Sequence, residues 1–277
     1  MARWIVACAV LLTGCSGNGS PVTPGASTIT LAGTVTATNG GQPLAGAHID
    51  TGGRSAVTNE SGRFTLPEAP TGRYALMISG AGLIPHVLTI DAQTATPLTL
   101  DAIAEASGFD LAFYRQFVRN GFEHAEALEP LRRWTTAPSF DIQTVDDTGA
   151  PVDPALRASV QAAIAATVPL LTGGRFNASF GSGVPVRFIA GAGTFCGRAP
   201  IGPIGAWIEL RYLSPTCTNW TRTVSHETGH VLGFWHTDQS GDLMRNGGAV
   251  TPSPRERAHA QIAYRRPVGN TDVDNDP

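Results

Sequence analysis

Two histidines and a glutamate stand in a short run whose spacing suits metal chemistry. His226 and His230 are four residues apart, so on a helix they lie on one face and both imidazoles can reach one metal ion. The side chain of Glu227 points in a somewhat different direction from the two imidazoles. This suits a general base that contacts a metal-bound water instead of the metal. The run therefore predicts a helix that carries two metal ligands and a catalytic base.

The chain is predicted to turn back directly after this helix. Gly233 follows His230 by three residues, where a left-handed glycine can end a helix. The turn brings His236 to the same metal ion. Three neutral imidazoles leave a fourth position open for water, which is the arrangement of a catalytic zinc ion. We therefore expect Zn²⁺ as the cofactor, held by His226, His230 and His236.

The run from His226 to His236 reads H-E-T-G-H-V-L-G-F-W-H. It resembles the metzincin zinc peptidases, whose signature H-E-x-x-H-x-x-G-x-x-H precedes a turn that contains a methionine. Met244 supplies that methionine, in a stretch that looks most like the matrixin branch. The resemblance implies an endopeptidase with a polypeptide substrate, in which the histidines bind zinc and Glu227 is catalytic. Met244 would form an apolar floor beneath the histidines.

The rest of this region follows the order of elements in metzincins. The pattern predicts strands over Phe140–Val145 and Val184–Ile189 and a helix over Pro154–Leu171. By the same resemblance, Gly205–Leu210 is the edge strand beside which an extended peptide would add. Asp146 and Asp147 are interpreted as part of a solvated loop.

One departure from matrixins limits the metal content. No histidine lies between His124 and His226, so the second, structural zinc site of matrixins has no counterpart. A single catalytic ion is expected.

Residues 1–14 have the pattern of an export signal. A basic start at Arg3 precedes the apolar run Trp4–Leu12, which is too short to span a bilayer, and Cys15 follows. This resembles the lipobox of bacterial lipoproteins and implies that a lipid on Cys15 anchors the protein, at the outer membrane or cell surface. The alternative is an ordinary secretory signal in which Cys15 is incidental. Residues 15–27 then predict a flexible tether.

Two of the four cysteines remain for a disulfide. Cys8 leaves with the signal and Cys15 would carry lipid, so Cys196 and Cys217 form the remaining pair. An oxidising compartment favours a bond between them. An alternative is that Cys196-Gly197 acts as an inhibitory thiolate on zinc, since fragments of the inhibitory motif of matrixin propeptides match here.

Residues 28–101 show short alternating runs separated by turn residues, which predicts a small antiparallel β-sandwich. The phrases Gln42–Ala47, Thr58–Phe64 and Pro70–Tyr74 resemble the carboxypeptidase regulatory-like domain, an accessory sandwich of exported bacterial proteins. Such a sandwich could bind a partner, but the sequence does not identify one. Residues 102–134 are predicted to be helical, either as a linker or as the first helix of the peptidase domain.

The expected fold class is α+β. A small all-β sandwich precedes a metzincin-like zinc peptidase domain over residues 135–270, with a mixed sheet and an active-site helix. The net charge is only -3, with no basic patch, so nucleic acid is not an expected partner. A second function class stays open, a zinc-binding surface protein that uses a peptidase scaffold without proteolysis.

Overall fold

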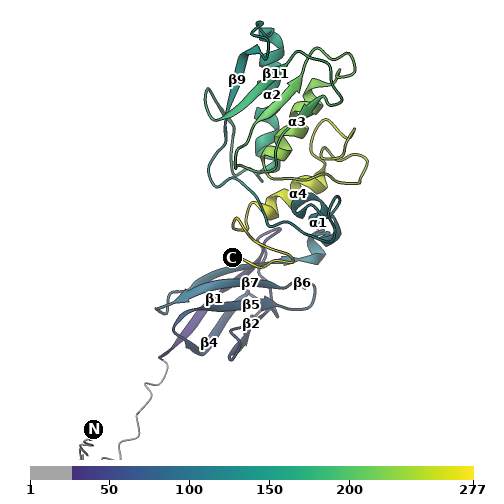
Figure 1. The fold of residues 1–277 in the computed structure, drawn as a ribbon. Coiled ribbons are helices and arrows are strands. Elements are labelled where there is room, and N and C mark those ends of the chain that lie inside the picture. The colour runs from purple at the N-terminus through teal and green to yellow at the C-terminus, as the bar shows by residue number, and fades with distance from the viewer. Residues whose placement is uncertain (1–26) are drawn as a thin grey trace, which may run out of the picture.

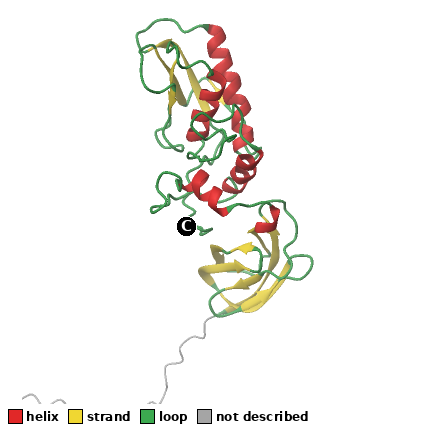
Figure 2. Cartoon of the chain, turned by 90° about the vertical axis from the view of Figure 1, so that its right-hand side faces the viewer, coloured by secondary structure: helices red, strands yellow, loops and turns green. Residues whose placement is uncertain are grey.

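A computed structural model describes residues 27–277, which form an all-β domain and a second domain that contains the α-helices (Figure 1). The same division is visible after a quarter turn (Figure 2). The predicted signal over residues 1–14 and the predicted lipid site Cys15 lie outside the described residues. So does the tether over residues 15–27, except for its last residue.

The described residues form thirteen β-strands, one 3-10 helix and four α-helices. The first domain contains β1 (Thr28–Ala37), β2 (His48–Asp50), β3 (Ser55–Val57), β4 (Arg63–Pro70), β5 (Gly72–Ser79), β6 (Leu83–Ile84), β7 (His86–Ala92) and β8 (Leu98–Ala104). The 3-10 helix (Glu105–Ser107) and α1 (Leu111–Arg119) follow it. The second domain continues with β9 (Ser139–Asp146), α2 (Pro154–Leu171), β10 (Ser179–Phe180), β11 (Val184–Ile189), β12 (Gly197–Arg198), β13 (Ile208–Arg211), α3 (Trp220–Val231) and α4 (Pro254–Ala263).

The first domain is a sandwich of two four-stranded sheets, ordered β4-β1-β8-β6 and β3-β2-β5-β7. Alternate residues such as Leu31, Leu66 and Ile78 fill the core between the sheets. The expected antiparallel pairing is wrong at one point, because β1 and β8 are parallel. Along the chain, all the strands of the second sheet come after β1 and before β8. They provide the long connection that two parallel strands need. Strand β8 also extends to Ala104, beyond the predicted boundary at residue 101.

The helix predicted over residues 102–134 is wrong in extent. Only α1 is α-helical in this stretch, because Asn120 adopts a left-handed φ of 61° and ends it. Nor is α1 a free linker. Phe113 and Phe117 are buried in the core of the second domain, so this segment belongs to that domain.

The second domain is built on a five-stranded sheet, ordered β10-β9-β11-β13-β12. The first four strands are parallel and β12 is antiparallel to β13. Helix α2 begins at the N-cap Asp153, whose side chain accepts from the Ala155 amide. It is apolar enough by length and composition to cross a membrane, but Ile164 and Val168 are fully buried in the domain core. We therefore describe α2 as a core helix.

The two domains are joined by a buried ion-pair network around Arg266, which is 1% exposed. Its guanidinium donates to Asp274 near the C-terminus at 2.6 and 2.7 Å and to Asp101 of β8 at 2.8 and 3.0 Å. It also donates to the hydroxyl of Thr38 at 2.9 Å. His86 of the sandwich bonds to Asp276 at 3.1 Å. The C-terminal residues thus lie against both domains.

Asp146 is not part of a solvated loop. Its carboxylate is buried at the end of β9 and accepts from the hydroxyl and amide of Thr148, from the Ala150 amide and from the Tyr212 hydroxyl. The Thr148 hydroxyl contributes most to lowering the pKa of Asp146, from 3.8 to about 2.

This lowered pKa makes Asp146 a source of acid sensitivity. A carboxyl whose pKa is lower in the folded state contributes stability that is present above its unfolded pKa and is lost as pH falls toward the folded value. We expect the melting temperature of the parent to approach that of Asp146→Asn as pH falls from about 4 to about 2. Thermal unfolding of both proteins between pH 6 and pH 2 measures this. A difference that stays constant over that range would contradict it.

Candidate metal centre

The predicted active-site helix is α3. It spans Trp220–Val231, and its N-cap Asn219 accepts from the Arg222 amide. His226, Glu227 and His230 lie in its interior and all three are buried. The helix therefore brings the two predicted ligands and the predicted base into one enclosed region.

Gly233 reverses the chain directly after α3. Its φ is +106°, and a Cβ at this position would overlap the carbonyl oxygen of Arg132. Both constraints require glycine. The amide of Phe234 donates back to the carbonyl of Gly229 at 3.0 Å, which fixes the turn. His236 is thereby brought against α3.

The three histidine rings converge through the same nitrogen. The Nε2 atom of His236 lies 3.2 Å from Nε2 of His226 and 3.1 Å from Nε2 of His230. Tetrahedral zinc with ligands at its usual distance holds nitrogen atoms about 3.4 Å apart, so the spacing fits such an ion. The structure thus brings the three predicted ligands together, and each offers one nitrogen atom that could bind a metal ion.

Hydrogen bonds at the opposite nitrogen assign the tautomers. Nδ1 of His226 lies 2.7 Å from the carbonyl oxygen of Leu243, and Nδ1 of His230 lies 2.9 Å from that of Phe234. A carbonyl only accepts, so both Nδ1 atoms carry the proton. The Nε2 atoms then present lone pairs to each other with no proton between them. A cation satisfies that arrangement.

Burial disfavours the charged forms of His226, His230 and Glu227. It lowers the pKa of His226 to about 4 and the pKa of His230 well below its ordinary value, so both rings are neutral ligands at pH 7. Burial also raises the pKa of Glu227 to about 8, against a smaller opposing effect of Arg222.

Met244 is fully buried. Its sulfur packs against α3 at Gly229, where a Cβ would overlap the sulfur atom, so a glycine between the two ligands makes room for the methionine. The preceding residue, Leu243, supplies the carbonyl that orients His226.

Glu256 holds this methionine turn and was not identified from the sequence. Its buried carboxylate accepts from the amides of Leu243 at 2.9 Å and Met244 at 2.8 Å. It also forms the capping box of α4 with Ser253. The S-x-x-E pattern could have placed Glu256 at a helix start, but not its second contact with the turn.

The edge of the sheet differs from the prediction. The strand expected over Gly205–Leu210 is observed as β13 over Ile208–Arg211, and it is not at the edge, because β12 pairs beside it. The segment around Cys196 folds back so that β12 pairs with the outer side of β13 and takes the edge position. Strand β12 borders a cavity of about 370 Å³ that is lined by Phe195, Gly197, Arg222, His226, Glu227 and Asn246.

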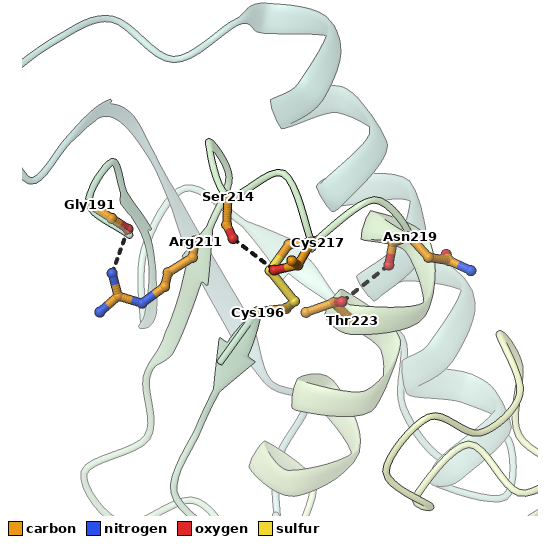
Figure 3. The surroundings of a disulfide bond; sticks show 8 residues. Gly191, Cys196, Arg211, Ser214, Cys217, Asn219 and Thr223 are labelled. Atoms are coloured by element: carbon orange, nitrogen blue, oxygen red, sulfur yellow. Dashed lines mark hydrogen bonds between the residues drawn. A yellow bond between two sulfur atoms is a disulfide. The ribbon is translucent and has the colours of Figure 1, made fainter. Parts of the chain in front are cut away.

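Cys196 and Cys217 form a disulfide in this structure (Figure 3). It joins the residue before β12 to the loop that leads into α3. The carbonyl of Cys196 accepts from Arg211 of β13, and the Cys217 amide donates to Ser214. A disulfide sulfur is not a thiolate, so the alternative of Cys196 as an inhibitory zinc ligand does not apply to this form.

A comparison with known protein families supports the assignment made for the first domain. Residues 30–105 match the family model of the carboxypeptidase regulatory-like domain. The chain therefore has such a domain at its N-terminal side, as the sequence phrases predicted. No curated protein matches the chain by sequence.

Solved structures give weaker likenesses. Metalloproteinase-II from Bacteroides fragilis is 11% identical, with 85% of this chain and 87% of that chain covered and a TM-score of 0.34. Two interface mutants of a type II cohesin–X-dockerin complex from Acetivibrio cellulolyticus are 22% and 24% identical, each with a TM-score of 0.24. The match covers 27% of this chain and spans 57% of each of those chains.

The disulfide is expected to stabilise the second domain. It closes a loop with a sequence separation of 21 residues. Replacing both cysteines with serine should lower the free energy of unfolding by about 3 kcal/mol, because the unfolded chain regains loop freedom. Denaturant unfolding of the parent and the double variant measures the difference. Equal midpoints would contradict a stabilising role.

Proposed function

We propose that the second domain is a zinc-dependent endopeptidase of metzincin type. The observation that carries the proposal is the convergence of three Nε2 lone pairs, with the buried carboxyl of Glu227 on the same helix. A helix, a glycine turn and a methionine turn surround this centre in the order that the metzincin signature requires.

The residues suit zinc in this role. His226, His230 and His236 would hold the ion, and three protein ligands leave a position open for water. Zinc bound there supplies Lewis acidity, which polarises a peptide carbonyl and lowers the pKa of water. The positive charge of a zinc ion held there would favour the ionised, proton-accepting form of Glu227. Glu227 would accept the proton of the attacking water and pass it to the leaving amine.

Strand β12 suits the binding of an extended substrate. It is the edge strand of the sheet, and only one of its sides pairs with β13. A peptide could add along the other side through main-chain hydrogen bonds. The cavity beside Glu227 would then receive one substrate side chain, with the Arg222 side chain in its lining.

Replacing Glu227 with glutamine separates catalysis from metal binding. The amide preserves the shape of the side chain but cannot accept the proton of water, so cleavage of an unstructured protein substrate should fall at least about a hundredfold. Zinc analysis should still give one equivalent per chain for parent and variant. Zinc binding without any cleavage by the parent would instead support the alternative, a zinc-binding surface protein without proteolysis.

We further propose that the protein is an exported lipoprotein. The basis is the lipobox-like sequence that ends at Cys15. The tether would then connect a membrane anchor at the outer membrane or cell surface to the sandwich, which could bind a partner.

The anchor can be tested at Cys15 itself. Cys15→Ser should lose labelling by a radioactive fatty acid and leave the membrane fraction, because no thiol remains to carry the lipid. Cys8→Ser is the matched control, since Cys8 lies inside the apolar run and should leave labelling unchanged. Membrane association of Cys15→Ser at the level of the parent would exclude the lipid anchor.

A further inference from the structure

The third histidine is oriented differently from the other two. His226 and His230 bond through Nδ1 to backbone carbonyls within the metal centre, whereas Nδ1 of His236 lies 2.6 Å from the carboxylate of Glu123. Glu123 is 113 residues earlier in the chain. The orientation of His236 therefore depends on a segment outside the metal-binding signature.

That segment is fixed against the chain around His236. Glu123 lies in the turn after α1, and the Phe117 ring of α1 stacks on Phe234 with ring centroids 4.2 Å apart. The carbonyl of Phe117 accepts from the Trp235 amide at 2.8 Å, and Gln116 accepts from the Asp238 amide at 3.3 Å. Contacts on both sides of His236 thus hold its backbone on α1.

The turn that presents Glu123 is itself built by hydrogen bonds. The Gly121 amide donates to Arg115 at 2.7 Å, and the His124 amide donates to Asn120 at 2.9 Å. The first bond lies just before Glu123 and the second spans it, so together they hold the backbone from which its carboxylate reaches His236.

We propose that Glu123 is a positioning residue for the metal ligand His236. A carboxylate only accepts, so it holds the proton on Nδ1 and leaves the Nε2 lone pair directed at the metal centre. It also makes the imidazole a more basic ligand. This inference rests on the proposed zinc site, and it adds the turn after α1 to that site.

A purely structural role would have a different signature. The Glu123 side chain is 40% exposed and that of His236 is 22% exposed. Exposed ion pairs contribute little to folding stability. A positioning role instead predicts weaker metal binding, by about 10-fold to 100-fold when the carboxylate partner of a ligand histidine is lost.

The experiment compares three variants of the full chain. Glu123→Ala removes the acceptor, Glu123→Gln keeps a neutral acceptor, and Glu126→Gln is the matched control. Glu126 lies in the same segment, its side chain is 79% exposed, and within residues 27–277 it pairs only with His124. Competition with a chromogenic chelator measures the zinc dissociation constant, and thermal unfolding of the zinc-free proteins measures stability.

We expect Glu123→Ala to bind zinc about 10-fold to 100-fold more weakly than the parent, Glu123→Gln to be intermediate, and Glu126→Gln to match the parent. The zinc-free melting temperatures should agree, and in the Co²⁺-substituted proteins the visible absorption bands should shift only for the Glu123 variants. Should Glu123→Ala fail to fold, Glu123→Gln decides the matter. Zinc affinity of the Glu123 variants within about twofold of the parent would overturn the role of Glu123 alone. A parent that binds no zinc would overturn the zinc site and this role together.

Discussion

Three hydrogen bonds, one from the Nδ1 atom of each histidine, organise the candidate metal centre. Each ring nitrogen that faces away from the centre bonds to a fixed acceptor, namely the carbonyls of Leu243 and Phe234 and the carboxylate of Glu123. These acceptors come from the methionine turn, the turn after α3 and the turn after α1. Histidine spacing alone would leave each ring free to rotate. The rest of the domain serves to hold these acceptors at the right places around α3.

The acceptors are in turn supported by buried polar groups. Glu256 binds the backbone of the methionine turn, and Asp242 accepts from Thr237, Ser253 and Arg255. Such groups are costly to bury without partners, so a complete set of hydrogen bonds favours one arrangement of the loop over others. The loop between α3 and α4 thus reaches a defined shape without regular secondary structure.

The sequence predicted those parts that local signals determine. Helix α2 and strand β11 have the bounds expected from their patterns, since a cap and an apolar period mark them. Strand β12 has two residues, and it is at the edge only because the disulfide-linked segment folds back. Glu123 carries no local signal, because an exposed glutamate in a turn resembles any other. These features depend on contacts between distant parts of the chain.

The junction at Arg266 bears on how freely the sandwich could be exchanged. Domains of this kind are often regarded as modules that can be joined to different enzymes through a linker. Here Asp101 and Thr38 of the sandwich complete the hydrogen bonding of an arginine buried on the other side. A sandwich from another protein that lacked these two groups would leave a buried charge with fewer partners. The accessory domain is therefore matched to this chain, and its replacement would require compensating changes at the junction.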